Sequence, residues 1–353
     1  MCAAAVKITW KSILTKVQQG QELGQEQLSW AMDQIMSGQA SSVIMAAFLM
    51  GLHSKTESAQ ELTYLAEGML KHSLDIDLPA AAVDIVGTGG DQHNTVNISS
   101  MSAVVIASAG IPVIKHGNRS SSSSSGSADV LEKLGIHLDL KVEQIKACFD
   151  ETGIAFLFAQ VFHPAMRFVA GVRKELSVPT AFNYLGPLTN PAKVRHSAIG
   201  VAHLPVAEKY AQVFQARPDQ HALIFRGRDG LDELTVTDLS DYWEVADGQI
   251  SRGVIDPSDY GIERADLADL RGGDASYNAA IFRAVINNEL TGPIRDAVLL
   301  NAAAGIAAYW PAAEKKFTDR LAAAYTLANQ CLEGGQAKEK LDRWIKISQK
   351  LSG

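Results

Sequence analysis

Asp84-Ile-Val-Gly-Thr-Gly-Gly-Asp91 is the segment that most strongly determines the fold. A short β-branched run passes into a loop with three glycines, and Asn97-Ile-Ser-Ser100 follows with the composition of a helix start. Glycines let a backbone approach a ligand closely, and the N–H groups at a helix N-terminus attract phosphate. The segment therefore predicts a strand, an anion-binding loop and a helix, although it has neither the GxGxxG spacing nor the Walker ending.

The rest of the sequence after Leu78 repeats this alternation of short β-branched runs and helical stretches. Strands are expected at residues 83–86, 111–114, 154–158, 198–201 and 222–225. Helices are expected at residues 99–109, 128–134 and 206–215, and then at 279–288, 295–310, 317–332 and 337–351. Such alternation is typical of an α/β domain with a central, mostly parallel sheet flanked by helices.

Residues 10–74 differ, because their apolar side chains recur at helical spacing without a strand pattern. Glycines divide this segment into four short helices, and Ser58 with Glu61 has the signature of a capping box. The sequence thus predicts a small all-helical domain at 1–78, joined by a helical segment near 163–190. The large α/β domain is expected at 79–353.

Composition limits the function. The chain has 353 residues, 47% of them hydrophobic, and a net charge of −7, which disfavours binding to nucleic acid or to an anionic membrane. An anionic ligand must therefore be held by a local site. Three cysteines without metal-ligand spacing, no apolar run of the ~20 residues that a membrane span needs and no secretory signal predict a cytoplasmic protein.

A second motif, Lys115-His-Gly-Asn-Arg119, follows the second expected strand, and the serines Ser120 to Ser125 lead to another helix start. Polar groups at the carboxyl end of a parallel strand lie where open α/β sheets bind ligands. The alternative is a pair of solvated charges at Lys115 and Arg119, but a second polar loop beside the glycine loop disfavours it. The serine run alone would suggest a flexible linker, and its position between a strand and a helix argues against that.

A third motif, Gly230-Leu-Asp-Glu-Leu-Thr235, follows the last expected strand and carries the adjacent carboxylates of Asp232 and Glu233. Acidic pairs are common on solvated turns. Near phosphate-binding loops, however, they suit Mg²⁺, which takes one or two protein carboxylates and keeps several waters.

The order GTGGD, KHGNR and DGLDELT resembles the anthranilate phosphoribosyltransferase family. The resemblance extends through residues 162–166, 172–175 and 182–191 and through the leading helices, so it covers nearly the whole chain. It implies transfer of the phosphoribosyl group of phosphoribosyl pyrophosphate to the amine of anthranilate, in tryptophan biosynthesis. It also implies a homodimer through the helical domain, whose apolar residues exceed the needs of one buried face.

The resemblance assigns roles to individual residues. The phosphoribosyl pyrophosphate site would comprise Gly87, Gly90, Asp91, Thr95, Asn97, Ile98, Ser99, Ser100, Lys115, His116, Gly117, Asn118, Arg119, Ser120, Ser121, Ser122, Ser123 and Ser127. Gly87, Asn118 and Arg173 would meet anthranilate, whose carboxylate suits a planar guanidinium. Ser99, Asp232 and Glu233 would hold Mg²⁺. No acid or base catalyst is expected, because an aromatic amine is unprotonated at neutral pH and positioning with charge neutralisation suffices.

The sequence departs from the usual family pattern at a few positions. A lysine common in the serine loop is Ser124, the glycine and arginine near the end of the Arg173 helix are Ser177 and Pro179, and a threonine hydroxyl is supplied by Ser100. These changes bear on affinity more than on the class of reaction.

Two alternatives stay open from the residues alone. A pyrimidine-nucleoside phosphorylase resembles this fold and also binds phosphate through a glycine loop, but the Asp232-Glu233 pair and the KHGNR motif argue against it. A non-catalytic, nucleic-acid-binding relative would lose the glycine loop and gain basic surface. The intact GTGGD and the net charge of −7 disfavour that interpretation.

Overall fold

The structure, a computed structural model, describes residues 7–120, 124–312 and 315–353. The chain divides into two compact units, one of Met1–Leu74 with Phe162–Pro191 and one of Asp75–Val161 with Ala192–Gly353. The segment 162–191 therefore groups with the N-terminal helices.

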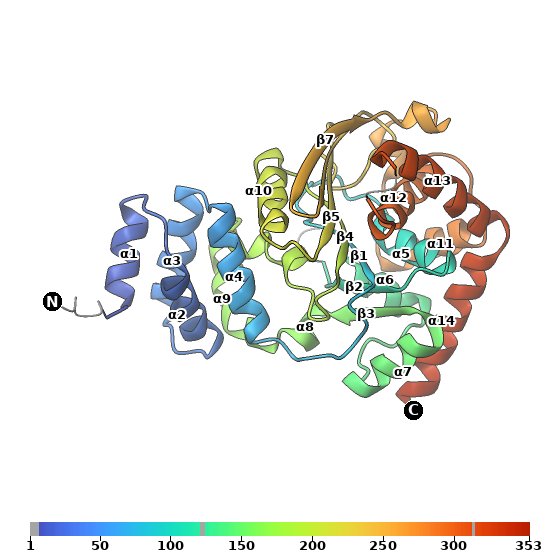
Figure 1. Ribbon diagram of the computed structural model, residues 1–353. Coiled ribbons are helices and arrows are strands. Elements are labelled where there is room, and N and C mark those ends of the chain that lie inside the picture. Colours follow the sequence, from blue (N-terminus) through green and yellow to red (C-terminus); the bar gives the residue numbers. More distant parts are fainter. Residues whose placement is uncertain (1–6, 121–123, 313–314) are drawn as a thin grey trace. The chain divides into compact units, whose positions relative to one another are not determined.

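The regular elements of the first unit are all helical among its described residues (Figure 1). Its main helices are α1 (Trp10–Gln18), α2 (Gln25–Met36), α3 (Ser42–Lys55), α4 (Ala59–Lys71) and α9 (Arg167–Leu176), with 3-10 turns at Pro164–Met166, Ala181–Asn183 and Gly186–Leu188. The predicted capping box is confirmed, because Ser58 accepts from the Glu61 N–H and Glu61 accepts from the Ser58 N–H. An aromatic cluster closes the core, with the Trp10 ring edge-on to Trp30 at 5.2 Å.

The second unit is built on a seven-stranded sheet in the order β3-β2-β1-β4-β5-β6-β7. The strands are β1 (Val83–Gly87), β2 (Val113–Gly117), β3 (Ile154–Phe158), β4 (His196–Gly200), β5 (His221–Gly227), β6 (Ser240–Ala246) and β7 (Gln249–Ile255). Strands β1 to β5 pair in parallel, and β6 and β7 extend the sheet as antiparallel strands. The predicted fold class, a helical domain with a mostly parallel α/β domain, is confirmed.

Helices cover both faces of this sheet (Figure 1). Helices α5 (Ile98–Ser108) and α12 (Pro293–Tyr309) pack together on one face, and α10 (Leu204–Gln215) packs against β5 and β6 on the other. Most residues of α5 and α12 are buried, because α5 and the part of α12 after Asp296 are apolar around the whole helix. The remaining helices are α6 (Ser127–Leu134), α7 (Val142–Thr152), α8 (Ala159–Phe162), α11 (Ala275–Ile286), α13 (Phe317–Glu333) and α14 (Gln336–Ser352).

Some predicted bounds were wrong. Strand β2 begins at Val113 and continues to Gly117, so Lys115 and His116 lie inside the strand instead of following it. The reason is that β2 pairs with β3 through Gly117 by backbone hydrogen bonds, which polar side chains do not interrupt. Strands β6 and β7 and helix α7 were not predicted, and in β7 most side chains are exposed, so the strand lacks an apolar run.

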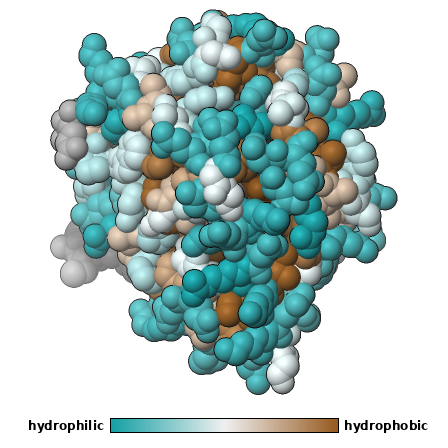
Figure 2. All heavy atoms as spheres, turned by 90° about the vertical axis from the view of Figure 1, so that its right-hand side faces the viewer, coloured by the Kyte–Doolittle hydropathy of each residue, from teal (hydrophilic) through white to brown (hydrophobic). Residues whose placement is uncertain are grey.

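The surface of the second unit around α13 and α14 is mostly hydrophilic, with hydrophobic residues in small scattered groups (Figure 2). This face therefore offers no extended apolar patch. Within the described ranges, none of the helices has the length and apolar character needed to cross a bilayer.

Candidate active site

The Asp232-Glu233 segment lies across the carboxyl ends of β1 and β4, where Gly87 is paired with Gly200. A Cβ on Gly87 would collide with Asp232 Oδ2, and one on Gly200 would collide with the Asp232 carbonyl oxygen. The Gly89 N–H donates to Asp232 Oδ2 at 2.6 Å. The third motif therefore meets the first directly, and glycine is needed at both strand ends for this approach.

The glycine loop makes a tight turn after β1. Gly89 and Gly90 have φ of +70° and +85°, a region that glycine adopts without strain. The end of the loop is anchored by an antiparallel bridge between Thr95 and Arg271. Within the loop, the Asp91 carboxylate accepts from the His93 N–H at 3.3 Å. The Asp91 carboxylate is thereby held beside the loop backbone.

Helix α5 begins directly beyond this loop, at Ile98. The Asn97 side chain donates to the Ser125 carbonyl at 3.2 Å and accepts from Asn278 Nδ2 at 2.9 Å, which ties the helix start to the end of the serine run. Ser100 Oγ is buried and has no hydrogen-bond partner among the described residues. A buried hydroxyl without a hydrogen-bond partner at a helix N-terminus is consistent with a site for an anionic ligand.

Lys115 is buried inside the sheet and does not face solvent. Its ammonium donates to the Ile85 carbonyl and, at 3.2 Å, to Ser99 Oγ. Burial lowers the pKa of Lys115, and the charges of Asp84, Glu233 and Asp232 act in the opposite direction. On the next residue, the His116 N–H donates to Asp84 Oδ1 at 3.1 Å. Lys115 therefore links β1, α5 and the acidic pair.

The segment after β2 is held against helix α6. Arg119 forms ion pairs with Asp129 at 2.9 Å and with Glu132 at 2.6 Å, and these carboxylates raise the pKa of its guanidinium. Asp129 Oδ2 also accepts from the N–H groups of Ser120 and Gly126, so one carboxylate ties both described ends of the serine loop. Arg119 thus holds this segment in place, and the Asn118 side chain is exposed beside it.

Ser127, the first residue of α6, continues this end of the site. Ser121, Ser122 and Ser123 lie outside the described residues. Ser124, the position of the usual lysine, is exposed.

Three carboxyl groups, those of Asp232, Glu233 and Asp91, interact at the acidic pair. Burial and the neighbouring Asp91 charge raise the pKa of Asp232 to about 7, against the effect of the Gly89 N–H. Burial and Asp232 raise the pKa of Glu233 well above its usual value, while Lys115 acts to lower it. Buried like charges repel one another strongly, and a divalent cation relieves that repulsion. Carboxylate and hydroxyl oxygens are also the hard donors that Mg²⁺ takes.

The side chains of the described residues do not complete a metal shell by themselves. Across residues 7–120, 124–312 and 315–353, no group of three His, Cys, Asp or Glu side chains is arranged to hold an ion. The donors present therefore fit an ion that keeps waters or phosphate oxygens as its other ligands.

Arg173 belongs to the first unit, on helix α9, whereas the other predicted site residues belong to the second. Its guanidinium is half-buried and donates to Asn183 Oδ1 at 3.3 Å. Within the described chain, no carboxylate lies at ion-pair distance from it. Burial lowers the pKa of Arg173, but a guanidinium stays protonated in proteins.

Sequence reasoning missed three residues that position the site. Asp129 ties the serine loop, Asn278 binds Asn97, and Asn301 on α12 binds the backbone of Leu234. Each is a single polar residue outside a recognisable motif. For Asn301 one signal existed, because it stands alone in an otherwise apolar stretch of helix, where a buried amide needs hydrogen-bond partners.

A glycine loop and an acidic pair meet at the carboxyl edge of the parallel sheet, and the family models identify the class of protein as a glycosyl transferase. Residues 79–338 match the glycosyl transferase family a/b domain, and residues 11–73 match the helical bundle domain of the same family.

Curated relatives narrow the class. An anthranilate phosphoribosyltransferase of Arthrobacter sp. (strain FB24) is 50% identical over 98% of both chains, and one of Thermobifida fusca (strain YX) is 47% identical over 97% of both. A crystal structure of the enzyme from Thermus thermophilus matches with a TM-score of 0.87 and 36% identity, over 96% of this chain and 99% of that one. The chain therefore belongs to the anthranilate phosphoribosyltransferase family, as the sequence predicted.

A solved relative carries ligands. The anthranilate phosphoribosyltransferase of Saccharomyces cerevisiae, in complex with PRPP and Mg, matches with a TM-score of 0.87 and 27% identity, over 97% of this chain and 98% of that one.

Proposed function

We propose that this chain transfers the phosphoribosyl group of 5-phosphoribosyl 1-pyrophosphate (PRPP) to the amine of anthranilate. The products are N-(5-phosphoribosyl)anthranilate and pyrophosphate, in the biosynthesis of tryptophan. The observation that carries the proposal is the direct contact of the glycine loop with Asp232, since it places a backbone suited to phosphate beside a carboxylate pair suited to a cation. Membership of the anthranilate phosphoribosyltransferase family supports the same reaction.

The PRPP site in this proposal follows the glycine loop, the start of α5 and the segment after β2. Gly87, Gly90 and the N-terminal N–H groups of α5 would cradle the pyrophosphate, as helix N-termini do for anions. Lys115 and Arg119 would act mainly by positioning other groups. Lys115 would hold Ser99, and Arg119 would hold the segment after β2 against helix α6. The full set comprises Gly87, Gly90, Asp91, Thr95, Asn97, Ile98, Ser99, Ser100, Lys115, His116, Gly117, Asn118, Arg119, Ser120, Ser121, Ser122, Ser123 and Ser127.

Anthranilate would be recognised through its carboxylate by Arg173, with Gly87 and Asn118 as further contacts. The support is the half-buried guanidinium of Arg173 that has no carboxylate at ion-pair distance within the described residues. A planar fork of donors suits a carboxylate in two-point contact.

Mg²⁺ would be held by Ser99, Asp232 and Glu233. The repulsion among the buried carboxylates and the oxygen donor set supports this assignment. The ion would supply neutralisation of the charge that develops on the pyrophosphate leaving group. The solved structure of the yeast relative with PRPP and Mg is consistent with such a requirement.

The chain's own residues would then work by positioning. The glycine loop and α5 would hold the donor, and Arg173 would orient the acceptor, so that the amine attacks the ribose C1 without a protein base. We further propose a homodimer through the helical unit and a cytoplasmic location. Both rest on the sequence expectations alone.

The proposal is tested by following the loss of anthranilate fluorescence with PRPP, in the presence and absence of Mg²⁺. Loss that requires both the donor and Mg²⁺ is expected. A parallel reaction contains a pyrimidine nucleoside and phosphate. Nucleoside cleavage without anthranilate loss would overturn the proposal in favour of a phosphorylase.

A further inference from the structure

The segment that carries Asp232 and Glu233 runs between the end of β5 at Gly227 and the start of β6 at Ser240. Its apolar residues Leu231, Leu234 and Val236 are fully buried, so the two carboxylates lie between anchored side chains. The Thr235 N–H donates to Ser240 Oγ at 3.0 Å, which closes the segment at its far side. The acidic pair therefore belongs to an ordered element whose position depends on identifiable contacts.

Asn301, a fully buried residue of α12, forms hydrogen bonds with the backbone directly after the acidic pair. Its Oδ1 accepts from the Leu234 N–H at 2.9 Å, and its Nδ2 donates to the Leu234 carbonyl at 2.8 Å. The second hydrogen of Nδ2 goes to the Ala297 carbonyl at 2.9 Å. Both donors of the amide are used, which fixes its orientation, and an apolar side chain of the same size would supply none of these bonds.

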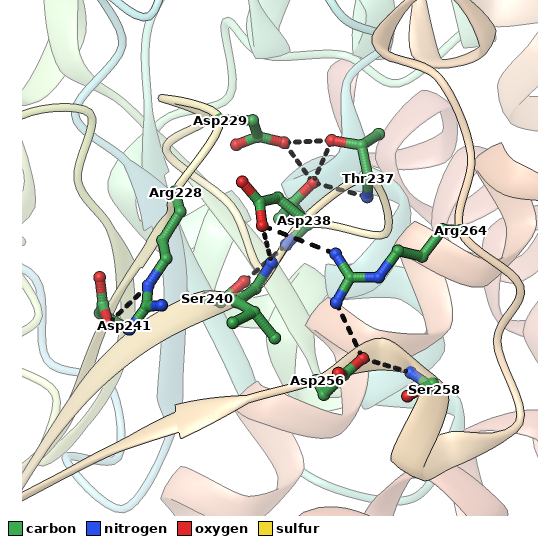
Figure 3. Close-up of polar contacts among 11 residues, drawn as sticks. Arg228, Asp229, Thr237, Asp238, Ser240, Asp241, Asp256, Ser258 and Arg264 are labelled. Atoms are coloured by element: carbon green, nitrogen blue, oxygen red, sulfur yellow. Dashed lines mark hydrogen bonds and ion pairs between the residues drawn. The ribbon is translucent and has the colours of Figure 1, made fainter.

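Asp229, which precedes the acidic pair, also forms hydrogen bonds with this segment. Its Oδ1 accepts from the Leu231 N–H at 3.0 Å, and its Oδ2 accepts from the hydroxyls of Thr235 and Thr237. Figure 3 shows Asp229 turned toward Thr237, away from the outer ion pairs of Arg228 with Asp241 and of Arg264 with Asp256. The carboxylate thus closes a ring around residues 229–237.

We infer that Asn301 and Asp229 are positioning residues that hold Asp232 and Glu233 in the geometry that binds Mg²⁺ with the donor pyrophosphate. Neither of them is assigned a contact with the substrate. Asn301 fixes the peptide after the acidic pair and Asp229 fixes the peptide before it, so the two carboxylates project from a segment clamped at both ends. Residues that orient metal ligands in this way commonly change metal affinity by about 10- to 100-fold when they are replaced.

The inference rests on the proposed function, and a binding measurement separates the two. Calorimetry of PRPP binding at increasing Mg²⁺ gives the half-saturating Mg²⁺ concentration without turnover. In Asn301→Leu we expect this concentration to rise by at least about tenfold. The anthranilate KM should stay within about twofold, because Arg173 is untouched.

Thr152→Val is the matched control for a lost buried hydrogen bond. Thr152 is buried at the end of α7, and its hydroxyl donates to the Cys148 carbonyl. A wild-type Mg²⁺ response in this variant, with a comparable loss of thermal stability, would show that destabilisation alone does not shift the response.

Asp229→Ala is the second variant, because Asn301→Leu can fail to fold. Asp229 is only partly buried, and its replacement releases the segment from the opposite side. We expect a similar rise in half-saturating Mg²⁺, with partial rescue in Asp229→Asn, whose amide oxygen can still accept from Leu231. Folded variants with the wild-type Mg²⁺ response would overturn the inference. If replacing Asp232 and Glu233 themselves leaves that response unchanged, the proposed metal site fails instead.

Discussion

The two units of the chain hold their candidate residues in opposite ways. In the second unit the acidic pair is buried, Asp232 accepts from the Gly89 N–H, and Asn301 binds the backbone of Leu234 directly after the pair. In the first unit Arg173 is half-buried, and its guanidinium donates to the side chain of Asn183. In the proposed function, the carboxylates that would meet a cation and a pyrophosphate are held in place, whereas the guanidinium that would meet a small carboxylate has no carboxylate partner among the described residues. We propose on this basis that the α/β unit serves the chemistry of the donor and the helical unit serves the recognition of the acceptor.

Removing the acidic pair should have the largest effect on this division of roles. In Asp232→Ala with Glu233→Ala, turnover should fall at least about 10³-fold, because the charge on the leaving group is no longer neutralised. The measurement is anthranilate fluorescence at saturating substrates. The double variant Asp259→Ala with Glu263→Ala, which removes two exposed carboxylates of the same unit, should keep wild-type turnover. Equal turnover in both double variants would contradict the division of roles.

A steric change at the strand edge should act next most strongly. In Gly200→Ala the new Cβ would collide with the Asp232 carbonyl oxygen, so the segment must shift, and overpacking of this kind costs about 1–3 kcal/mol of stability. Turnover should fall by about 10²-fold through the displaced carboxylates. Urea unfolding and kinetics would be measured together. Gly186→Ala, where nothing lies within 4 Å of the new carbon, is the control, and a harmless Gly200→Ala would show that the close approach is not needed.

A substitution in the first unit should change the KM of one substrate and leave the KM of the other nearly unchanged. Arg173→Ala should raise the anthranilate KM by about 10- to 100-fold, as expected for the loss of a charge-assisted pair, with the PRPP KM within about twofold. The neighbouring exposed Lys174→Ala should change neither constant. Equal effects of Arg173→Ala on both KM values would point to a structural role for α9.

The smallest expected effect concerns the stability of the helical unit. Burial lowers the pKa of His163 to about 4, and its Nε2 lies 3.1 Å from the Thr189 carbonyl, so the imidazole is neutral when folded. The unfolded chain binds a proton near pH 6.5, so this contribution is full above about pH 6.5 and is lost as the pH falls toward about 4. Against His163→Gln, wild-type stability should decline by about 2–3 kcal/mol more between about pH 7 and pH 4.5. Parallel declines in urea unfolding would show that His163 does not titrate this way.

The sequence predicted the fold class and pointed to the three loops of the candidate site because each depends on local patterns. Glycines at a strand end and polar residues after a strand report backbone geometry directly. The position of Lys115 was harder to predict from the sequence, because its inclusion in β2 depends on pairing with β3, which is a tertiary property. Strand β7 was missed because this mostly exposed edge strand has no apolar run to mark it, and β6 was missed although it is largely buried, because polar residues interrupt its apolar ones.

The positioning residues were beyond local patterns as well. Asn301 lies 67 residues from Leu234 in sequence, and Asn278 lies 181 residues from Asn97. Only folding brings such pairs together, and one asparagine in a helix does not indicate its partner. Motif reasoning therefore finds groups that would contact the substrates more readily than groups that hold them in place.

The decisive experiment is calorimetry of PRPP binding with and without Mg²⁺, on the wild-type chain and on Asp232→Ala with Glu233→Ala. We predict that Mg²⁺ tightens PRPP binding to the wild type and has little effect on the double variant, because the protein ligands are gone. If Mg²⁺ tightens PRPP binding equally in both proteins, the acidic pair is not the metal site and the proposed division of roles is contradicted.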